Sequence, residues 1–376
     1  MITRCTRCLI PTTRPDTAFV GGVCSACIAH DAHQQVDWAL RYSELVRLLD
    51  SRRRPGAEFD CVVASSGGKD SIAQVLSLLD IGAHPLVVTA TTCMLTETGR
   101  YNIDVLKRYA PTIEVTPDQQ ARARLNRFGL EMVGDVSWPE HVAIFTTPMR
   151  VAVAMGLPLV FYGENPQAQY GGPLGTQDAR QMTRRWVSEF GGFLGLRPVD
   201  AVLAGVMSKR NMLEYVFPDD ESLARVGTEA HFLGQYLGPW DSRANAARAI
   251  KAGMRTLFPS PSVANWWQFE NLDNAMTGLH DHMMYLKYGY GRACAQVSVD
   301  IRKEYLNRDA GLRIVTERDG ILPETYAGVS LDSVLERIDV TREELKAIFT
   351  RFTNHDLFSL YGDSHAGEAR DSGTAG

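Results

Sequence analysis

The chain has 376 residues, which is long enough for two or three domains and a sizeable buried core. Hydrophobic residues make up 45% of the sequence and charged residues 22%, a balance typical of soluble globular proteins. The net charge of -5 argues against a mainly nucleic-acid-binding protein, because phosphate binding needs clustered cations. The N-terminus lacks the apolar stretch of a signal peptide, and no segment approaches the roughly 18 consecutive apolar residues of a membrane span. We therefore expect a cytoplasmic protein with reduced thiols and no membrane partner.

Four of the seven cysteines form two closely spaced pairs near the N-terminus. Cys5, Cys8, Cys24 and Cys27 follow the pattern C-x2-C-x15-C-x2-C. Each pair places two thiolates on one side of a tight knuckle, and two knuckles supply the tetrahedral sulfur set that Zn²⁺ prefers. The pattern predicts a zinc-ribbon-like module over residues 1–30. Because four protein sulfurs leave no open coordination position, the expected role is structural.

Strands and helices alternate in the next part of the chain. Short apolar runs predict strands over 61–64, 85–90, 112–115 and 157–162, and helical spacing predicts helices over 71–81, 103–109 and 149–155. This alternation predicts an α/β fold with a doubly wound parallel sheet, whose ligands bind beyond the carboxyl ends of the strands. The expected regions are a helical linker over 31–54, the sheet domain over 55–205, a mostly helical C-terminal region over 206–363 and a disordered tail over 364–376.

A glycine-rich loop lies between the first expected strand and helix. Glycines let backbone N–H groups approach an anion closely, and the helix N-terminus adds a favourable partial charge. Lys69 supplies a full positive charge, while Asp70 can hold Mg²⁺ or cap the helix. A Walker A loop is excluded, because its pattern fails at Val63 and Asp70. The residues expected to form the cofactor-binding loop are Ser66, Gly67, Gly68, Lys69, Asp70 and Ser71.

The six residues Ser-Gly-Gly-Lys-Asp-Ser resemble the PP-loop of ATP pyrophosphatases, which split ATP into AMP and pyrophosphate. The resemblance implies the PP-loop type of fold, also called adenine nucleotide alpha hydrolase-like. It also implies a reaction in which a carbonyl oxygen is adenylated and a nucleophile then displaces AMP. Lys69 and Asp70 would contribute to this catalysis.

Further motifs narrow the resemblance. They are Ser137–His141, Gly163–Gln167, Gln169–Gly172, Glu270–Asn274, Gly278–His282 and Lys287–Ala293. Together with the cysteine pairs, they resemble the N-acetyl sugar amidotransferase family of lipopolysaccharide and surface-polysaccharide biosynthesis, over nearly the whole chain. The resemblance implies that ATP and ammonia convert an acetamido group on a sugar or sugar nucleotide to an acetamidino group. Members of the family take ammonia from a separate glutaminase.

Several polar residues stand where the active site is expected. Glu164 and Asn165 follow the fourth expected strand, a position that suits Mg²⁺ or substrate binding, although a helix cap or turn also fits. Glu140 and His141 suit substrate binding or proton transfer, with a structural role equally open. The segment His280–His282 resembles a metal cluster, but residues 280 and 282 point in different directions on a helix.

One cysteine supports a rival interpretation. Cys93 follows the second expected strand, where a thiol can carry a persulfide and make the chain an ATP-dependent sulfurtransferase supplied by a cysteine desulfurase. The other interpretation is a small, semi-buried hydrophobic residue. A tRNA-modifying enzyme that uses the zinc knuckle is a second rival, although the acidic net charge counts against nucleic acid as a partner.

Overall fold

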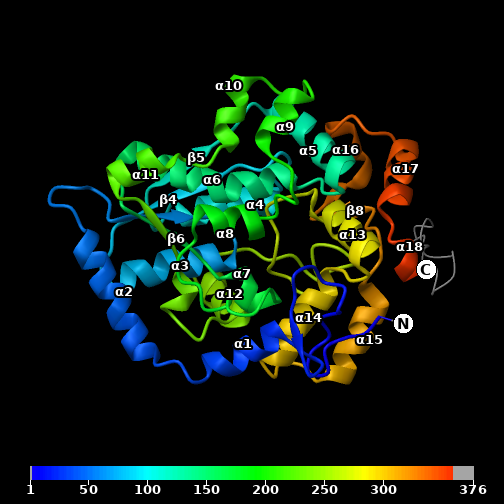
Figure 1. Ribbon diagram of the computed structural model, residues 1–376, viewed down its shortest axis with the longest axis horizontal. Coiled ribbons are helices and arrows are strands. Elements are labelled where there is room, and N and C mark those ends of the chain that lie inside the picture. The colour runs from blue at the N-terminus through cyan, green and yellow to red at the C-terminus, as the bar shows by residue number, and fades with distance from the viewer. Residues whose placement is uncertain (1, 359–376) are drawn as a thin grey trace.

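Five parallel strands form the centre of the computed structural model, which describes residues 2–358 (Figure 1). Their order across the sheet is β5-β4-β3-β6-β7. The chain therefore runs from β3 outward to one edge, and then returns to the other side of β3 to form β6 and β7. The strands are β3 (Cys61–Ala64), β4 (Pro85–Ala90), β5 (Thr112–Val115), β6 (Leu159–Tyr162) and β7 (Glu229–Phe232).

Helices cover both faces of this sheet (Figure 1). Successive strand residues point to opposite faces, so Val63 packs with Ile72 in one buried cluster and Val62 packs with Met149 in another. The first face is covered by α3 (Lys69–Asp80), α4 (Glu97–Leu106) and α12 (Ser242–Lys251). The second is covered by α6 (Trp138–Met155) and α8 (Arg184–Phe190). The predicted α/β fold with a doubly wound parallel sheet is confirmed.

Two helices begin earlier than the sequence pattern predicts. Helix α4 starts after Thr96, whose side-chain oxygen accepts a hydrogen bond from the Gly99 N–H at 2.9 Å. Helix α6 starts at Trp138 with a proline in its first turn, and it continues through Pro148. The expected start at residue 149 was therefore wrong, because an interior proline does not end this helix.

The fifth strand lies beyond the expected boundary of the sheet domain. β7 pairs in parallel with β6, so the sheet extends past residue 205 into a part predicted to be helical. The strand is short, and Glu229 and His231 interrupt its apolar character. A helical pattern does dominate from α12 onward.

The remaining elements surround the sheet and form the C-terminal part (Figure 1). Near the sheet are α5 (Gln119–Val133), α7 (Pro166–Tyr170), α9 (Pro198–Leu203), α10 (Lys209–Met212) and α11 (Asp220–Val226), with 3-10 turns at Leu213–Tyr215 and Leu233–Gln235. The C-terminal part contains α13 (Thr277–Tyr288), α14 (Arg292–Arg302), α15 (Arg308–Arg318), β8 (Thr325–Tyr326), β9 (Val329–Ser330), α16 (Leu331–Arg337), α17 (Arg342–Phe352) and α18 (His355–Phe358). The predicted disordered tail over 364–376 lies outside the described residues. Among the described residues, no helix has the length and apolar character needed to cross a membrane.

The N-terminal cysteine module packs against helices from the far end of the chain. Leu9 is buried in a cluster with Cys294 and Val297 of α14. The Arg308 guanidinium of α15 donates hydrogen bonds to the backbone carbonyls of Cys5 and Cys8, both at 3.3 Å. The elements of this part of the chain are β1 (Phe19–Val20), β2 (Val23–Cys24), α1 (Ser25–His33) and α2 (Trp38–Arg52).

The same module also contacts the segment that follows α7. The Ser25 hydroxyl donates a hydrogen bond to the Gly172 carbonyl at 2.8 Å, and the Gly172 N–H donates to Ser25 Oγ at 3.0 Å. The Ala18 N–H donates to the same carbonyl at 3.1 Å. These hydrogen bonds hold the cysteine module against the segment that follows α7, although the two are far apart in the sequence.

Candidate active site

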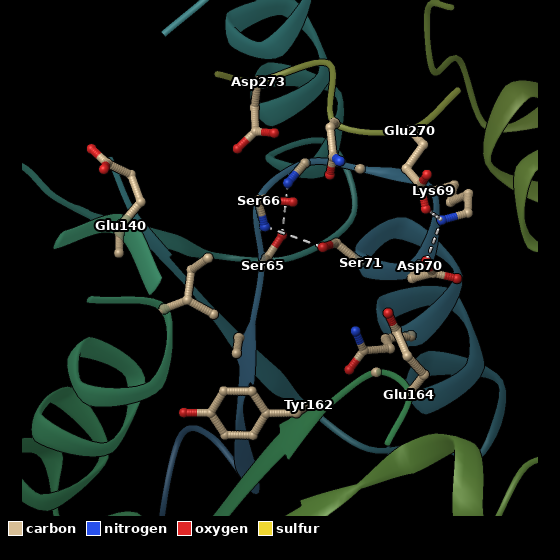
Figure 2. Close-up of a pocket in the computed structure, with 18 of the residues that line it drawn as sticks. Ser65, Ser66, Lys69, Asp70, Ser71, Glu140, Tyr162, Glu164, Glu270 and Asp273 are labelled. Atoms are coloured by element: carbon tan, nitrogen blue, oxygen red, sulfur yellow. Dashed lines mark hydrogen bonds and ion pairs between the residues drawn. The ribbon is translucent and has the colours of Figure 1, made fainter. Parts of the chain in front are cut away.

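A cavity of about 390 Å³ opens at the carboxyl ends of β3 and β6 (Figure 2). These two strands are neighbours at the point where the strand order reverses, and this is where doubly wound sheets bind ligands. The loop after β3, residues 65–71, forms one wall. Gly163 and Glu164 after β6 form another, and residues 269–273 also line the cavity.

Two serine side chains of the glycine-rich loop accept hydrogen bonds from N–H groups of the same loop. The Ser66 N–H donates to Ser71 Oγ at 3.1 Å, and the Gly67 N–H donates to Ser65 Oγ at 3.2 Å. Gly67 has a φ of +81°, and a Cβ there would lie 2.9 Å from Ile103. Only glycine fits such a position without strain. The loop ends at the N-terminus of α3, a position that favours an anion.

Lys69 is buried beside two carboxylates. Its Nζ atom lies 2.6 Å from Asp70 Oδ2 and 3.7 Å from Glu270 Oε1. Figure 2 shows the three side chains near one another in the cavity wall. The ring centroids of Trp267 and Phe269 lie 5.8 and 5.9 Å from the same atom. Burial lowers the pKa of Lys69, but the Asp70 and Glu270 carboxylates outweigh it and raise the pKa above its usual value. The lysine is therefore a permanent positive charge in the cavity wall.

Glu164 adds a third carboxylate to this wall (Figure 2). Burial and the neighbouring Asp70 carboxylate raise the pKa of Glu164 to about 7, although Lys69 opposes the shift. Burial also raises the pKa of Glu270, but Lys69 and Arg292 outweigh it and hold the pKa below its usual value. Asp70, Glu164 and Glu270 together carry more negative charge than Lys69 compensates. Such a group of oxygen donors suits Mg²⁺.

Asp273 and Arg292 lie in two of the motifs named above, but they were not predicted to be site residues. Asp273 lines the cavity, and burial raises its pKa to about 6. Arg292 also lines the cavity, and its guanidinium donates to the Asp281 carboxylate at 2.7 to 3.1 Å. The residues next to Asp273 and Arg292 in the sequence form no pattern from which a role in this cavity can be predicted. Asp273 and Arg292 lie more than a hundred residues after β6 in the sequence, and the fold brings them to the cavity.

Asn165, predicted as an active-site residue that binds Mg²⁺ or substrate, is the N-cap of α7. It is 2% exposed, and its side-chain oxygen accepts from the Gln167 N–H at 3.0 Å. Its amide nitrogen donates to the backbone carbonyls of Thr176, Gln177 and Ala179. Both polar atoms of the Asn165 side chain therefore have hydrogen-bond partners within the protein. Of the two predicted roles, the structure supports the helix cap.

Cys93 lies behind the cavity wall. The described residues that line the cavity include Thr92 but not Cys93, which is 8% exposed and packs in a buried cluster with Ala275 and Met276. Burial and the nearby Glu140 carboxylate raise the pKa of the Cys93 thiol. A buried neutral thiol is a poor nucleophile. The structure does not bring Cys93 to the other predicted catalytic residues.

Glu140 and His141 differ in their surroundings, although both line the cavity. Glu140 is buried in an ion pair with Arg122, 3.1 Å long, and accepts hydrogen bonds from Asn126 and from the Cys93 N–H. It lies well away from Lys69 (Figure 2). Glu140 therefore stabilises the cavity wall through these contacts, whereas the His141 side chain is partly exposed.

The four N-terminal cysteines are gathered as predicted. All four are buried, and their sulfurs lie within 4.8 Å of one another. The Sγ atoms of Cys5 and Cys27 are 3.8 Å apart, and those of Cys8 and Cys24 are 3.6 Å apart. Ligand sulfurs in a tetrahedral zinc site are about 3.8 Å apart, from a Zn–S distance near 2.3 Å. The geometry of the sulfurs fits zinc.

The two histidines of the segment 280–282 point to different neighbours, as helical geometry predicts. His280 contacts Asp135 and the ring of His141. His282 is buried against Phe349, and burial lowers its pKa to about 4.

The C-terminal part of the chain matches a known family. Residues 262–368 match the model described as LPS biosynthesis protein WbpG-like, C-terminal domain. The match confirms, over this segment, the predicted resemblance to a family of lipopolysaccharide biosynthesis. Among solved structures, NMN synthetase from Francisella tularensis is similar at 14% identity and a TM-score of 0.27, over 60% of this chain and 100% of that one. No curated protein matches the chain.

Proposed function

We propose that the chain is an ATP-cleaving amidotransferase. It converts the acetamido group of an N-acetylated sugar or sugar nucleotide to an acetamidino group, with ammonia as the nitrogen donor. The observation that carries this proposal is the loop 66–71 at the switch point of a parallel sheet, with Lys69 facing three carboxylates. The match of residues 262–368 to a lipopolysaccharide biosynthesis domain supports a sugar acceptor.

The phosphate loop would hold the pyrophosphate end of ATP. Its backbone N–H groups and the N-terminus of α3 favour an anion, and Lys69 supplies a full charge where the leaving pyrophosphate becomes more negative. Asp70, Glu164 and Glu270 would hold Mg²⁺, whose charge would offset that of the phosphates. The raised pKa of Glu164 supports this placement, because burial and the Asp70 carboxylate both disfavour its charged form, and a bound cation would stabilise that form.

The proposed reaction proceeds in two displacement steps. The acetamido oxygen attacks the α-phosphorus, the bond to the β-phosphate oxygen breaks, and pyrophosphate leaves. The nitrogen of ammonia adds to the activated carbon, the carbon–oxygen bond breaks, and AMP leaves with that oxygen. Asp273, which lines the cavity, would accept the proton that the attacking nitrogen loses, since a pKa of about 6 suits a base at neutral pH.

Ammonia comes from a separate glutaminase under this proposal, and free ammonium should replace that partner in vitro. The sulfur alternative needs a reactive thiol in the cavity, and the buried position of Cys93 counts against it. No observation in the described part of the chain favours a desulfurase as the partner.

The test is a turnover reaction with ATP, Mg²⁺, ammonium and a panel of nucleotide-linked N-acetyl sugars. We expect AMP and pyrophosphate, and a sugar product lighter by the difference between O and NH. A parallel reaction with sulfide in place of ammonium would give a product heavier by the difference between S and O. ADP as the sole nucleotide product, or a product formed only with sulfide, would overturn the proposal.

A further inference from the structure

A second group of metal-ligating side chains lies apart from the four cysteines. It consists of Asp135, His141 and His280, which we call the Asp-His-His cluster. Asp135 lies in the turn between α5 and α6, His141 lies in the first turn of α6, and His280 lies near the start of α13. One ligand atom from each residue lies within 4.8 Å of the others. The cluster joins the sheet domain to the C-terminal helices.

The two imidazoles face the same carboxylate. Nδ1 of His280 lies 2.7 Å from Asp135 Oδ1, and Nδ1 of His141 lies 3.1 Å from Asp135 Oδ2. The His141 nitrogen is buried and out of line for a hydrogen bond to that oxygen, so it has no hydrogen-bond partner among the described residues. A metal ion bound by these atoms would take the place of the His280–Asp135 hydrogen bond and would supply the partner that the His141 nitrogen lacks.

The carboxylate of Asp135 is buried, and a backbone hydrogen bond fixes its orientation. Its Oδ1 atom accepts this hydrogen bond from the Ser137 N–H at 2.8 Å. The ammonium of Lys287 donates to the Val133 carbonyl at 3.1 Å, and no ion pair joins it to Asp135 among the residues described. The two imidazoles are therefore the groups that face this buried charge, and buried charges are costly unless paired or bound to a metal.

We propose that the Asp-His-His cluster is a second metal site, for a divalent ion of the zinc class. Two imidazoles and one carboxylate are the mixed nitrogen and oxygen set that zinc and similar transition metals accept. Three protein ligands leave at least one coordination position for water or a ligand oxygen. The site differs in this respect from the closed four-sulfur site, and it does not depend on the proposed reaction.

The open position faces solvent-accessible space. The three residues line a second cavity of about 370 Å³, together with Arg14 and Tyr288. His141 also lines the phosphate-loop cavity, so the ion would sit in the wall between the two cavities. An oxygen-bearing ligand in the second cavity can therefore reach the metal.

Metal content of the full chain tests this proposal. We expect two zinc ions per chain after purification without chelator and dialysis against a small excess of zinc. Asp135→Asn and His280→Asn should each reduce the content to one. The control His84→Asn, at an exposed histidine outside the cluster, should retain two.

Cobalt titration of the unaltered chain gives a second measurement that does not depend on variants that fold. The first equivalent should produce thiolate-to-cobalt charge transfer from the cysteine site. The second should add ligand-field absorption without further charge transfer, because its ligands are nitrogen and oxygen. Saturation at one metal per chain, or two metals that both remain in Asp135→Asn and His280→Asn, would overturn the proposal.

Discussion

The ammonium of Lys69 lies 2.6 Å from the carboxylate of Asp70, its neighbour in the sequence, and both residues line the phosphate-loop cavity. The contact compensates a lysine charge that would be costly to bury alone. A phosphate group can take over that compensation, and this leaves Asp70 to bind Mg²⁺. The pair is thus suited to receive an anion and a cation together.

Lys69→Ala should lower the rate of AMP formation by roughly 10²–10³, because one charge contact to a developing anion is removed. AMP release measured by chromatography tests this expectation. Lys251→Ala, at an exposed lysine on α12, is the matched control and should behave like the unaltered chain. A Lys69→Ala rate within tenfold of the control would show that the loop does not act on ATP as proposed.

Mg²⁺ binding should weaken as the pH falls through the raised pKa of Glu164, about 7. A protonated carboxyl cannot bind the ion, so the half-saturating Mg²⁺ concentration should rise about tenfold per pH unit below that value. ATP cleavage measured against Mg²⁺ concentration between pH 6 and 8 checks this. Glu164→Gln should need more Mg²⁺ at every pH and lose this pH dependence. An unaltered slope in Glu164→Gln would rule out the carboxyl as the titrating ligand.

Cys24→Ser should destabilise the fold more than it alters the chemistry of the site, because closed sulfur sites contribute folding free energy. We expect the free energy of unfolding to fall by about 4 kcal/mol or more, as for other losses of a structural metal. Urea unfolding of the variant and of the unaltered chain measures the difference. A zinc-free chain that unfolds at the same urea concentration as the zinc-bound chain would contradict a structural role.

Cys93→Ser should retain ammonium-dependent turnover within about tenfold, because a small change behind the wall costs about 1 kcal/mol at the site. Cys61→Ser is the matched control, since Cys61 is buried in β3 and has no proposed role. Loss of product only in Cys93→Ser, with ATP cleavage intact, would support sulfur transfer.

Asp273→Asn should separate the two chemical steps. Removing a general base is expected to slow the ammonia step by roughly 10²–10⁴. Exchange of labelled pyrophosphate into ATP, which reports adenylation alone, should persist because the phosphate loop is unchanged. If both measurements fall together, Asp273 serves adenylation or the fold and not the attack of ammonia.

The sheet and the phosphate loop could be predicted because their signals are local. The expected strands at 61–64, 85–90 and 112–115 match β3, β4 and β5, since buried parallel strands read as apolar runs. The loop 66–71 and the paired cysteines are likewise short patterns whose chemistry depends on spacing. The structure places both as predicted.

Other features depend on contacts between distant segments and could not be predicted. Strand β7 contains polar residues and so lacks the apolar run that predicts a buried strand, and it is identified by its pairing with β6. Asp273 reaches the cavity, and His280 meets His141, through the packing of the C-terminal helices. Glu164 and Asn165 are adjacent in sequence, yet one faces the cavity and the other caps α7. Residue type alone cannot separate two such neighbours.

The hydrogen bonds between Ser25 and Gly172 join the cysteine module to a segment beside the phosphate-loop cavity. Ser25 follows the ligand Cys24 directly, and Gly172 lies two residues after Tyr170, which lines the cavity and contacts Glu270 at 3.2 Å. A chain synthesised during zinc shortage would therefore have a loosened cavity wall even where its sheet has formed. If the cysteines bind zinc and the cavity binds ATP as proposed, zinc shortage at synthesis would reduce ATP binding as well as stability.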